Sequence, residues 1–132
     1  MLKIILPLTA AILLSASSTV LAQETPEACR GGHMGHQMPA MTDTSGMTDV
    51  QKAFTEGMDK MHPAMAAGVM AEDPDVAFVC GMIPHHQGAI DMAKVELQYG
   101  KDAWTKELAQ KIIEAQTQEI AEMTKWLEAH AK

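Results

Sequence analysis

The chain has 132 residues, which is room for one domain, and its formal net charge is −7 at neutral pH. An acidic chain of this size is a poor match for nucleic acid or an anionic lipid surface, so neither is expected as a partner. Twelve Met accompany six His and two Cys. Because methionine fills gaps but specifies packing poorly, so much of it calls for a further reason, and thioether sulfur is a soft ligand that selects Cu(I).

Residues 1–22 are predicted to form a secretory signal peptide. A basic start with Lys3 precedes an apolar stretch that is too short to span a bilayer, and Val20-Leu21-Ala22 is typical of a cleavage site. Cleavage after Ala22 would give a periplasmic or secreted chain, with net charge −8 because Lys3 is lost from the −7 of the whole chain. No later segment is apolar enough to predict a membrane span.

Residues 23–47 are predicted to form a flexible tail, because they are rich in Gly, Pro, Thr, Ser and Met and have no helical or strand period. The tail contains the segment HMGHQM, whose side chains could wrap a soft ion without a preformed cage. A linker with incidental His is the alternative. The candidate ligands here are His33, Met34, His36 and Met38.

Cys29 lies in this tail and Cys80 in a predicted helix. Two cysteines in an oxidising compartment usually pair, which favours a disulfide that ties the tail to that helix. A pair of soft thiolate ligands is the alternative, and the spacing alone leaves both open.

Residues 48–132 are predicted to form an all-α domain, a small antiparallel bundle of three to four helices. The first helix covers about residues 49–70 and starts at a capping box made by Thr48 and Gln51. Pro63 should kink it on the face opposite its apolar stripe. That stripe contains Met47, Phe54, Met58, Met61, His62, Met65 and Val69.

The second helix is predicted over about residues 74–98, with Asp73 as N-cap, Pro74 at the first helical position and Gly100 just past the end in the usual C′ manner. Its apolar arc is wide, so the helix should be buried against more than one neighbour. The arc contains Phe78, Val79, Met82, Ile83, Ala89, Ile90, Met92, Ala93 and Leu97, and it includes His85 and His86, whereas Pro84, Gln87, Asp91 and Gln98 fall outside it.

The third helix is predicted over about residues 103–129, with Asp102 as N-cap. Its other face is rich in Lys, Glu, Gln and Thr, as a solvated face should be. The core stripe contains Leu108, Ile112, Ala115, Gln116, Ile120, Met123 and Leu127, with Trp126 beside it.

The second helix carries the main candidate metal site. Met82, His85 and Met92 return to one face, so one imidazole and two thioethers could converge on an ion. His86 lies about 100° away and could join only if Pro84 bends the helix. Ordinary histidines, one buried and one exposed, are the alternative. An unpaired buried imidazole is costly, however, which favours metal.

The neighbouring helices extend this candidate site. Met58, Met61, His62 and Met65 in the first helix and Met123 in the third would complete a Met/His-lined interior. Methionine used simply as core filler is the alternative for the thioethers.

Other chemistry has little support. A di-iron bundle would need paired E-x-x-H motifs, and only Asp59 to His62 approximates one half. The sequence has no C-x-x-C-H motif for covalent haem attachment. Zinc prefers Cys, His and carboxylate ligands, so the many methionines would not help to bind it. No pair of a nucleophile and a base can be identified. The sequence is therefore not expected to be that of an enzyme.

The segments FVCGMIPHHQGAIDMA and LAQKIIEAQTQEIAEMTKW closely resemble the DUF305 family over about residues 54–126. The matching elements are the His85-His86 pair, the A-I-x-M-A run at 89–93, Q-x-x-E-I-x-x-M-x-x-W at 116–126 and Met61-His62. The resemblance implies an exported, ferritin-like helical protein, and several members are associated with copper binding and copper resistance. The resemblance does not include Cys80 or the His/Met tail, so it gives them no role.

The residues and the resemblance together favour a periplasmic copper-binding protein. It would hold Cu(I), with Ag(I) or Cu(II) as further ions, and sequester it or pass it to a periplasmic copper carrier or an efflux component. A copper-dependent redox enzyme that oxidises Cu(I) is one alternative. A Met-rich protein-interaction module is the other.

Overall fold

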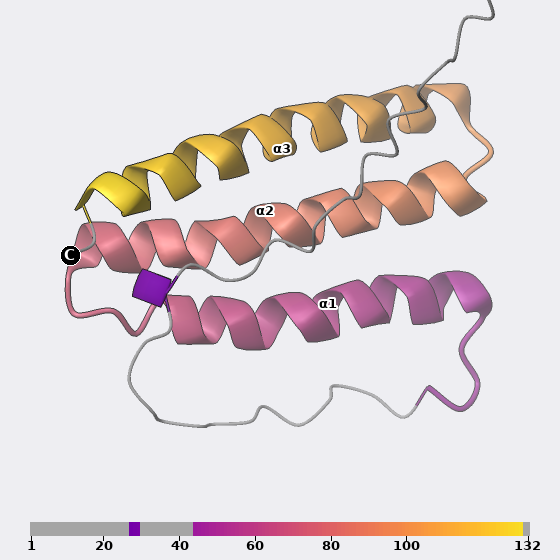
Figure 1. Ribbon diagram of the computed structural model, residues 1–132. Helices are drawn as coiled ribbons and strands as arrows, with labels where there is room; N and C mark the ends of the chain where they lie inside the picture. The colour runs from indigo at the N-terminus through magenta and orange to yellow at the C-terminus, as the bar shows by residue number, and fades with distance from the viewer. Residues whose placement is uncertain (1–26, 30–43, 131–132) are drawn as a thin grey trace, which may run out of the picture.

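Three antiparallel helices make up most of the part of the chain that the computed structural model describes, residues 27–29 and 44–130. α1 spans Asp49–Gly68, α2 spans Pro74–Tyr99 and α3 spans Ala103–His130, and the short 3-10 helix η1 covers Glu27–Cys29 (Figure 1). The described residues contain no strand, so the all-α prediction is confirmed. The predicted signal peptide and the candidates His33, Met34, His36 and Met38 lie outside these residues.

The helix starts follow the local signals in the sequence. Thr48 and Gln51 make the predicted capping box: the Gln51 amide N–H donates to Thr48 Oγ1 at 3.3 Å and the Thr48 N–H donates to Gln51 Oε1 at 2.8 Å. Asp73 Oδ1 accepts from the N–H groups of Asp75 and Val76 at 2.9 and 3.0 Å. These side chains satisfy N–H groups that have no partner within the helix.

The helix ends differ in detail from the prediction. α1 ends at Gly68 rather than at about residue 70, while α2 and α3 each extend one residue further than expected. Gly100 follows α2, but its φ of −64° and ψ of 152° are extended rather than left-handed. The expected C′ conformation is therefore wrong, because the chain leaves α2 through an extended residue whose N–H still donates to Glu96 O at 2.8 Å.

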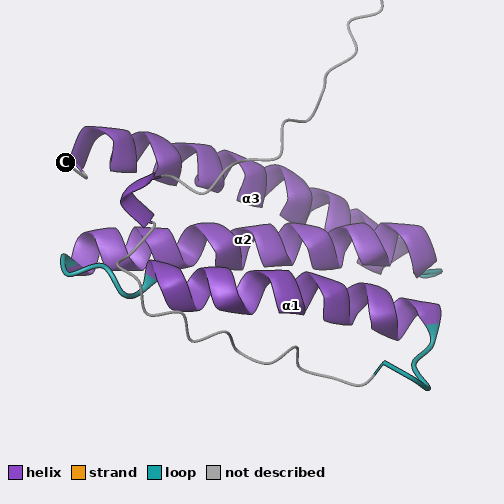
Figure 2. Cartoon of the chain, turned by 60° about the horizontal axis from the view of Figure 1, so that its bottom comes forward, coloured by secondary structure: helices purple, strands orange, loops and turns teal. Residues whose placement is uncertain are grey.

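α2 is the central helix, with α1 and α3 packed on opposite sides of it (Figures 1 and 2). Within the described residues α1 and α3 have almost no contact with each other, so the three helices form a layer, and the other two sides of α2 have no helix against them except for the short η1 at one end. None of the helices in the described part is both long and apolar enough to cross a membrane.

This arrangement corrects the expected burial of α2. Phe78 is 64% exposed, Met92 is 50% exposed and His85 is also exposed, because they point to a side of α2 that neither neighbour covers. The buried residues of α2 are Cys80, Gly81, His86, Gly88, Ile90, Ala93 and Val95.

The outer helices are also less buried than the stripes predicted. In α1, Met58 is 36% exposed, and Val69, the first residue after the helix, is 51% exposed. Ala115 is exposed in α3, whereas Ala109, absent from the predicted stripe, is buried. Each outer helix has a single helical neighbour, so only a narrow strip of its surface is covered.

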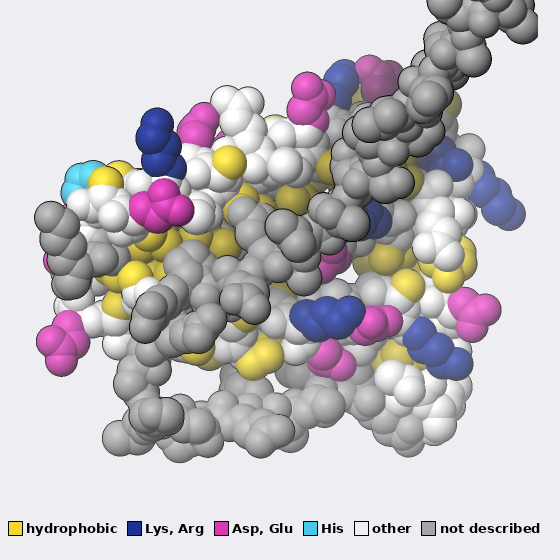
Figure 3. All heavy atoms as spheres, viewed as in Figure 1, with side chains coloured by type: hydrophobic (Ala, Val, Ile, Leu, Met, Phe, Trp, Pro, Cys, Tyr) yellow, Lys and Arg dark blue, Asp and Glu magenta, His cyan; other side chains and the backbone are white. Residues whose placement is uncertain are grey.

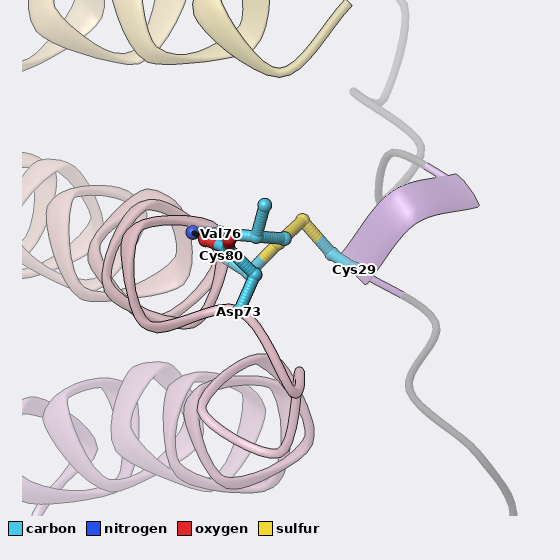
Figure 4. Close-up of a disulfide and its surroundings, with 4 residues drawn as sticks. All are labelled: Cys29, Asp73, Val76 and Cys80. Atoms are coloured by element: carbon cyan, nitrogen blue, oxygen red, sulfur yellow. Dashed lines mark hydrogen bonds between the residues drawn. A yellow bond between two sulfur atoms is a disulfide. The ribbon is translucent and has the colours of Figure 1, made fainter. Parts of the chain in front are cut away.

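The disulfide between Cys29 and Cys80 lies in the core at one end of the layer. Cys29 reaches from η1 to α2 next to Val76, one turn before Cys80 (Figure 4). Both cysteines and Leu127 are at most 3% exposed, and Val79, Ile83 and Trp126 pack against them. Of the two alternatives for the cysteines, the structure therefore has the disulfide.

Candidate functional site

His86 is the buried polar centre of the α2–α3 interface. Its ring Nδ1 lies 2.9 Å from the carbonyl oxygen of Met82, and its Nε2 lies 2.7 Å from Glu119 Oε2. A carbonyl oxygen can only accept, so Nδ1 carries a hydrogen and donates to Met82. This hydrogen bond fixes the ring orientation and leaves Nε2 as the ring atom that can bind a ligand.

The Nε2 atom is already occupied by Glu119. A contact of 2.7 Å between a ring nitrogen and a carboxylate oxygen requires a proton between the two atoms. Because both ring nitrogens have protein partners, His86 is not an unpaired buried imidazole. The desolvation argument for metal therefore does not apply to His86.

The contact between His86 and Glu119 also sets the register of α2 against α3. The two helices are antiparallel (Figure 1), so one turn back in α2 and one turn forward in α3 brings Met82 level with Met123. Near the other end, Thr105 Oγ1 donates to Glu96 Oε1 at 2.7 Å, although the 86/119 register brings Glu96 level with Ala109, one turn further along α3. Both methionines are half-buried.

The register of α1 against α2 follows from three close approaches: Gly57 with Asp91, Met61 with Gly88, and Gly68 with Cys80. Continuing this register brings Met58 level with Met92, and Met65 level with His85. His62 is half-buried beside Met61 in the same part of α1. Thioethers and imidazoles therefore occur in two rows, one on each side of α2.

Helical spacing puts nearly all of these side chains on one side of the layer. Met82, His85 and Met92 lie roughly 150° around α2 from Cys80, Pro84, Gln87 and Asp91, which line a cavity on the other side. Met92 also lines a separate open groove with Phe54 and Leu108, which confirms the side it occupies. We call this side the Met/His face, and it contains Met58, His62, Met65, Met82, His85, Met92 and Met123.

Met61 departs from this set. It lies over Gly88, whose missing side chain leaves room for the Met61 thioether, and it lines the cavity on the disulfide side. His85 and His86 differ as well: their rings meet edge to face at 6.0 Å, with His85 exposed and His86 buried. Pro84 therefore does not turn both rings inward.

The cavity on the disulfide side has a volume of about 170 Å³ and lies between all three helices and the disulfide. Its walls are mainly apolar, with Ile83, Ile120 and Met61 among them, and Lys60, Gln87 and Asp91 are its polar members. Figure 3 shows the same side of the molecule, with hydrophobic side chains visible between the helices.

Lys60 brings positive charge to this cavity. Its ammonium donates to Glu56 Oε1 at 2.7 Å, and this hydrogen bond raises the pKa of Lys60 and lowers the pKa of Glu56, with charge attraction adding to both. Both side chains are 68% exposed, so the pair contributes little to stability.

The described residues contain no group of three or more His, Cys, Asp or Glu side chains placed to hold a metal ion. His86 and Glu119 form a pair of such side chains at the α2–α3 interface. Any further donors there would come from the thioethers of Met82 and Met123.

Glu119 is the residue that sequence reasoning missed. It appeared inside the Q-x-x-E element of the resemblance, but no role could be given to it, because its partner His86 lies 33 residues away. The signal that could have found it is the register of two antiparallel helices joined by a short loop, which brings these two positions level.

Comparison with known proteins adds one finding to this geometry. A search of curated proteins finds no match to the chain. The family model DUF305, described as a domain of unknown function, matches residues 13–127 and so most of the 132 residues. The predicted resemblance is confirmed, and the chain belongs to the DUF305 family.

Proposed function

We propose that this chain is an exported copper-binding protein that holds Cu(I) and either sequesters it or passes it to another carrier. The observation that carries the proposal is the α2–α3 register, which brings two thioethers, Met82 and Met123, level with each other one turn from the His86 ring. Sulfur and imidazole donors together suit Cu(I), and Ag(I) would share the thioethers.

The second row of donors supports binding of more than one ion. Met58 and Met92 are at least one-third exposed, and His85 is exposed, so these donors are open to an ion from solvent. Cu(II) would prefer the imidazoles to the thioethers. Neutral thioethers, of which Met58 and Met92 are exposed, on an acidic protein suit uptake and release of a cation.

The decisive experiment is a Cu(I) titration of the protein against a chromophoric chelator. We expect Met82→Leu with Met123→Leu to weaken Cu(I) binding at least about tenfold, because the change removes both sulfur donors. Exchange of Met for Leu nearly conserves volume and costs less than about 1.5 kcal/mol, so the fold should survive. A larger loss of Cu(I) affinity is expected when Met82, His85, His86 and Met92 are all replaced by Leu or Ala.

The matched control is Met70→Leu, which changes an exposed methionine in the loop after α1 and should leave Cu(I) affinity unchanged. Failure of the parent protein to compete with the chelator would rule out the copper proposal. Oxygen consumption on addition of Cu(I) would instead indicate the redox-enzyme alternative.

Binding of a protein partner is a second candidate function, and it rests on exposed apolar side chains on the same side of the layer as the Met/His face. Phe78, Met92 and Leu108 are 64%, 50% and 40% exposed, and the groove beside Met92 and Leu108 has a volume of about 330 Å³. Large exposed apolar surface often marks a protein-interaction site. Unchanged thermal stability on addition of Cu(I) would favour this function over copper binding.

A further inference from the structure

We propose that the Glu119 carboxylate blocks the metal-binding nitrogen of His86 in the metal-free protein and that a soft ion must displace it. The inference rests on the proposed function and assigns a role to one more residue of the same site. Glu119 would act as a competitor for His86, not as a ligand of the ion.

The first step is that His86 has one usable nitrogen. The hydrogen bond from Nδ1 to the Met82 carbonyl, at 2.9 Å, holds the ring in place from within α2 itself. Metal-binding histidines generally donate their other ring N–H to such an acceptor, which fixes the ring and directs the free nitrogen at the ion. In His86 this directed atom is Nε2.

The second step is that Glu119 holds the position an ion would take. Its Oε2 atom lies 2.7 Å from Nε2, and the hydrogen of this contact occupies the space between the two atoms. An ion can reach the Nε2 lone pair only after this carboxylate moves away. The proton then leaves to solvent, and no atom changes oxidation state.

The third step is that Glu119 can move and His86 cannot. The His86 side chain is 11% exposed and is held between two helices, whereas the Glu119 side chain is 50% exposed. Gln116 Nε2 also donates to Glu119 Oε2, but over a long distance of 3.4 Å. Rotation of Glu119 into solvent would open Nε2, one turn from Met82 and Met123, without moving a helix.

The direction in which Glu119 changes the affinity for Cu(I) separates its two possible roles, blocking group and ligand. A blocking carboxylate lowers the affinity for Cu(I), because its contact with His86 must be broken first. A carboxylate ligand would raise that affinity. A blocking group that returns to Nε2 would also speed release of the ion, which suits transfer better than storage.

The test compares Cu(I) affinity and release rate in the parent, Glu119→Ala and Glu119→Gln, using the same chromophoric chelator. We expect Glu119→Ala to bind Cu(I) about tenfold more tightly and to release it more slowly, since a hydrogen bond to a charged group is lost from the metal-free state alone. Glu119→Gln should fall between the two, because its amide makes only a neutral hydrogen bond with His86.

The matched control is Glu114→Ala, which removes the same charge from an exposed position of α3 that lies about 140° around the helix from Glu119. It should leave the affinity close to that of the parent. An equal change in both variants would mean that charge alone is responsible and would overturn the proposal.

Equal or weaker binding by Glu119→Ala, with the parent still binding, would overturn the blocking role and leave the copper function standing. If neither the parent nor Glu119→Ala binds Cu(I), both the blocking role and the copper function are overturned. A metal-free readout tests the geometry directly: the ¹⁵N NMR signal of His86 Nε2 should change in Glu119→Ala and stay unchanged in Glu114→Ala. If Glu119→Ala loses its helical circular dichroism, Glu119→Gln carries the comparison.

Discussion

Replacing Cys29 and Cys80 together by alanine is expected to lower the free energy of unfolding by about 4 kcal/mol. The two residues are 51 positions apart, so their disulfide closes a long loop and removes much of the freedom of the unfolded chain. The cysteines are also among the most buried residues of the described part and pack against Leu127. A small domain with total stability of roughly 5–15 kcal/mol would lose a large share of it.

The measurement is urea unfolding of both proteins, followed by circular dichroism at 25 °C. Treatment of the parent with a thiol reductant should produce most of the same loss, and the double variant should not respond to the reductant. A loss below about 1 kcal/mol, with both proteins fully folded in the absence of urea, would contradict the prediction, because loop closure would then contribute almost nothing.

Local signals in the sequence were sufficient to predict where helices start. Thr48 with Gln51, and Asp73 with Pro74, act through atoms within three residues of one another, so their effect does not depend on the rest of the fold. The ends were less predictable. Gly100 follows α2 as expected, but its extended conformation depends on the path to α3, which spacing does not give.

Burial could be predicted only in part, because spacing says which side chains share a face and not which faces have a neighbour. The wide arc of α2 suggested a helix surrounded by others. In the structure, α1 and α3 cover two opposite sides, so His86 and Ile90 are buried while His85 and Met92 are exposed. The predicted Met/His-lined interior is instead largely a Met/His face.

The candidate site shows the same limit. Its methionines and histidines were found from composition and from their repeat along each helix. The partner of His86 was not, because a contact between residues 86 and 119 depends on how two helices align. The resemblance had marked Glu119 as part of a pattern, and the structure supplies the physical contact.

The last prediction concerns the contact between α1 and α2, where glycines allow the two backbones to approach closely. A side-chain carbon added at Gly68 would meet the backbone of α2, with the Cys80 carbonyl carbon at 2.6 Å and the Gly81 nitrogen at 2.9 Å. Backbone atoms inside a helix cannot rotate away. Gly68→Ala is therefore expected to push the end of α1 off α2 and to lower the free energy of unfolding by about 1–3 kcal/mol or more.

Gly57→Ala is the matched control on the same helix and against the same neighbour. Its added carbon would lie 3.6 Å from Asp91 Cβ, an ordinary contact, so alanine should stabilise the protein by about 0.4–1 kcal/mol through the unfolded chain. Urea unfolding of the two variants beside the parent should therefore give changes of opposite sign. A stabilising effect of Gly68→Ala would mean that α1 and α2 do not approach as closely at this end as the structure has them.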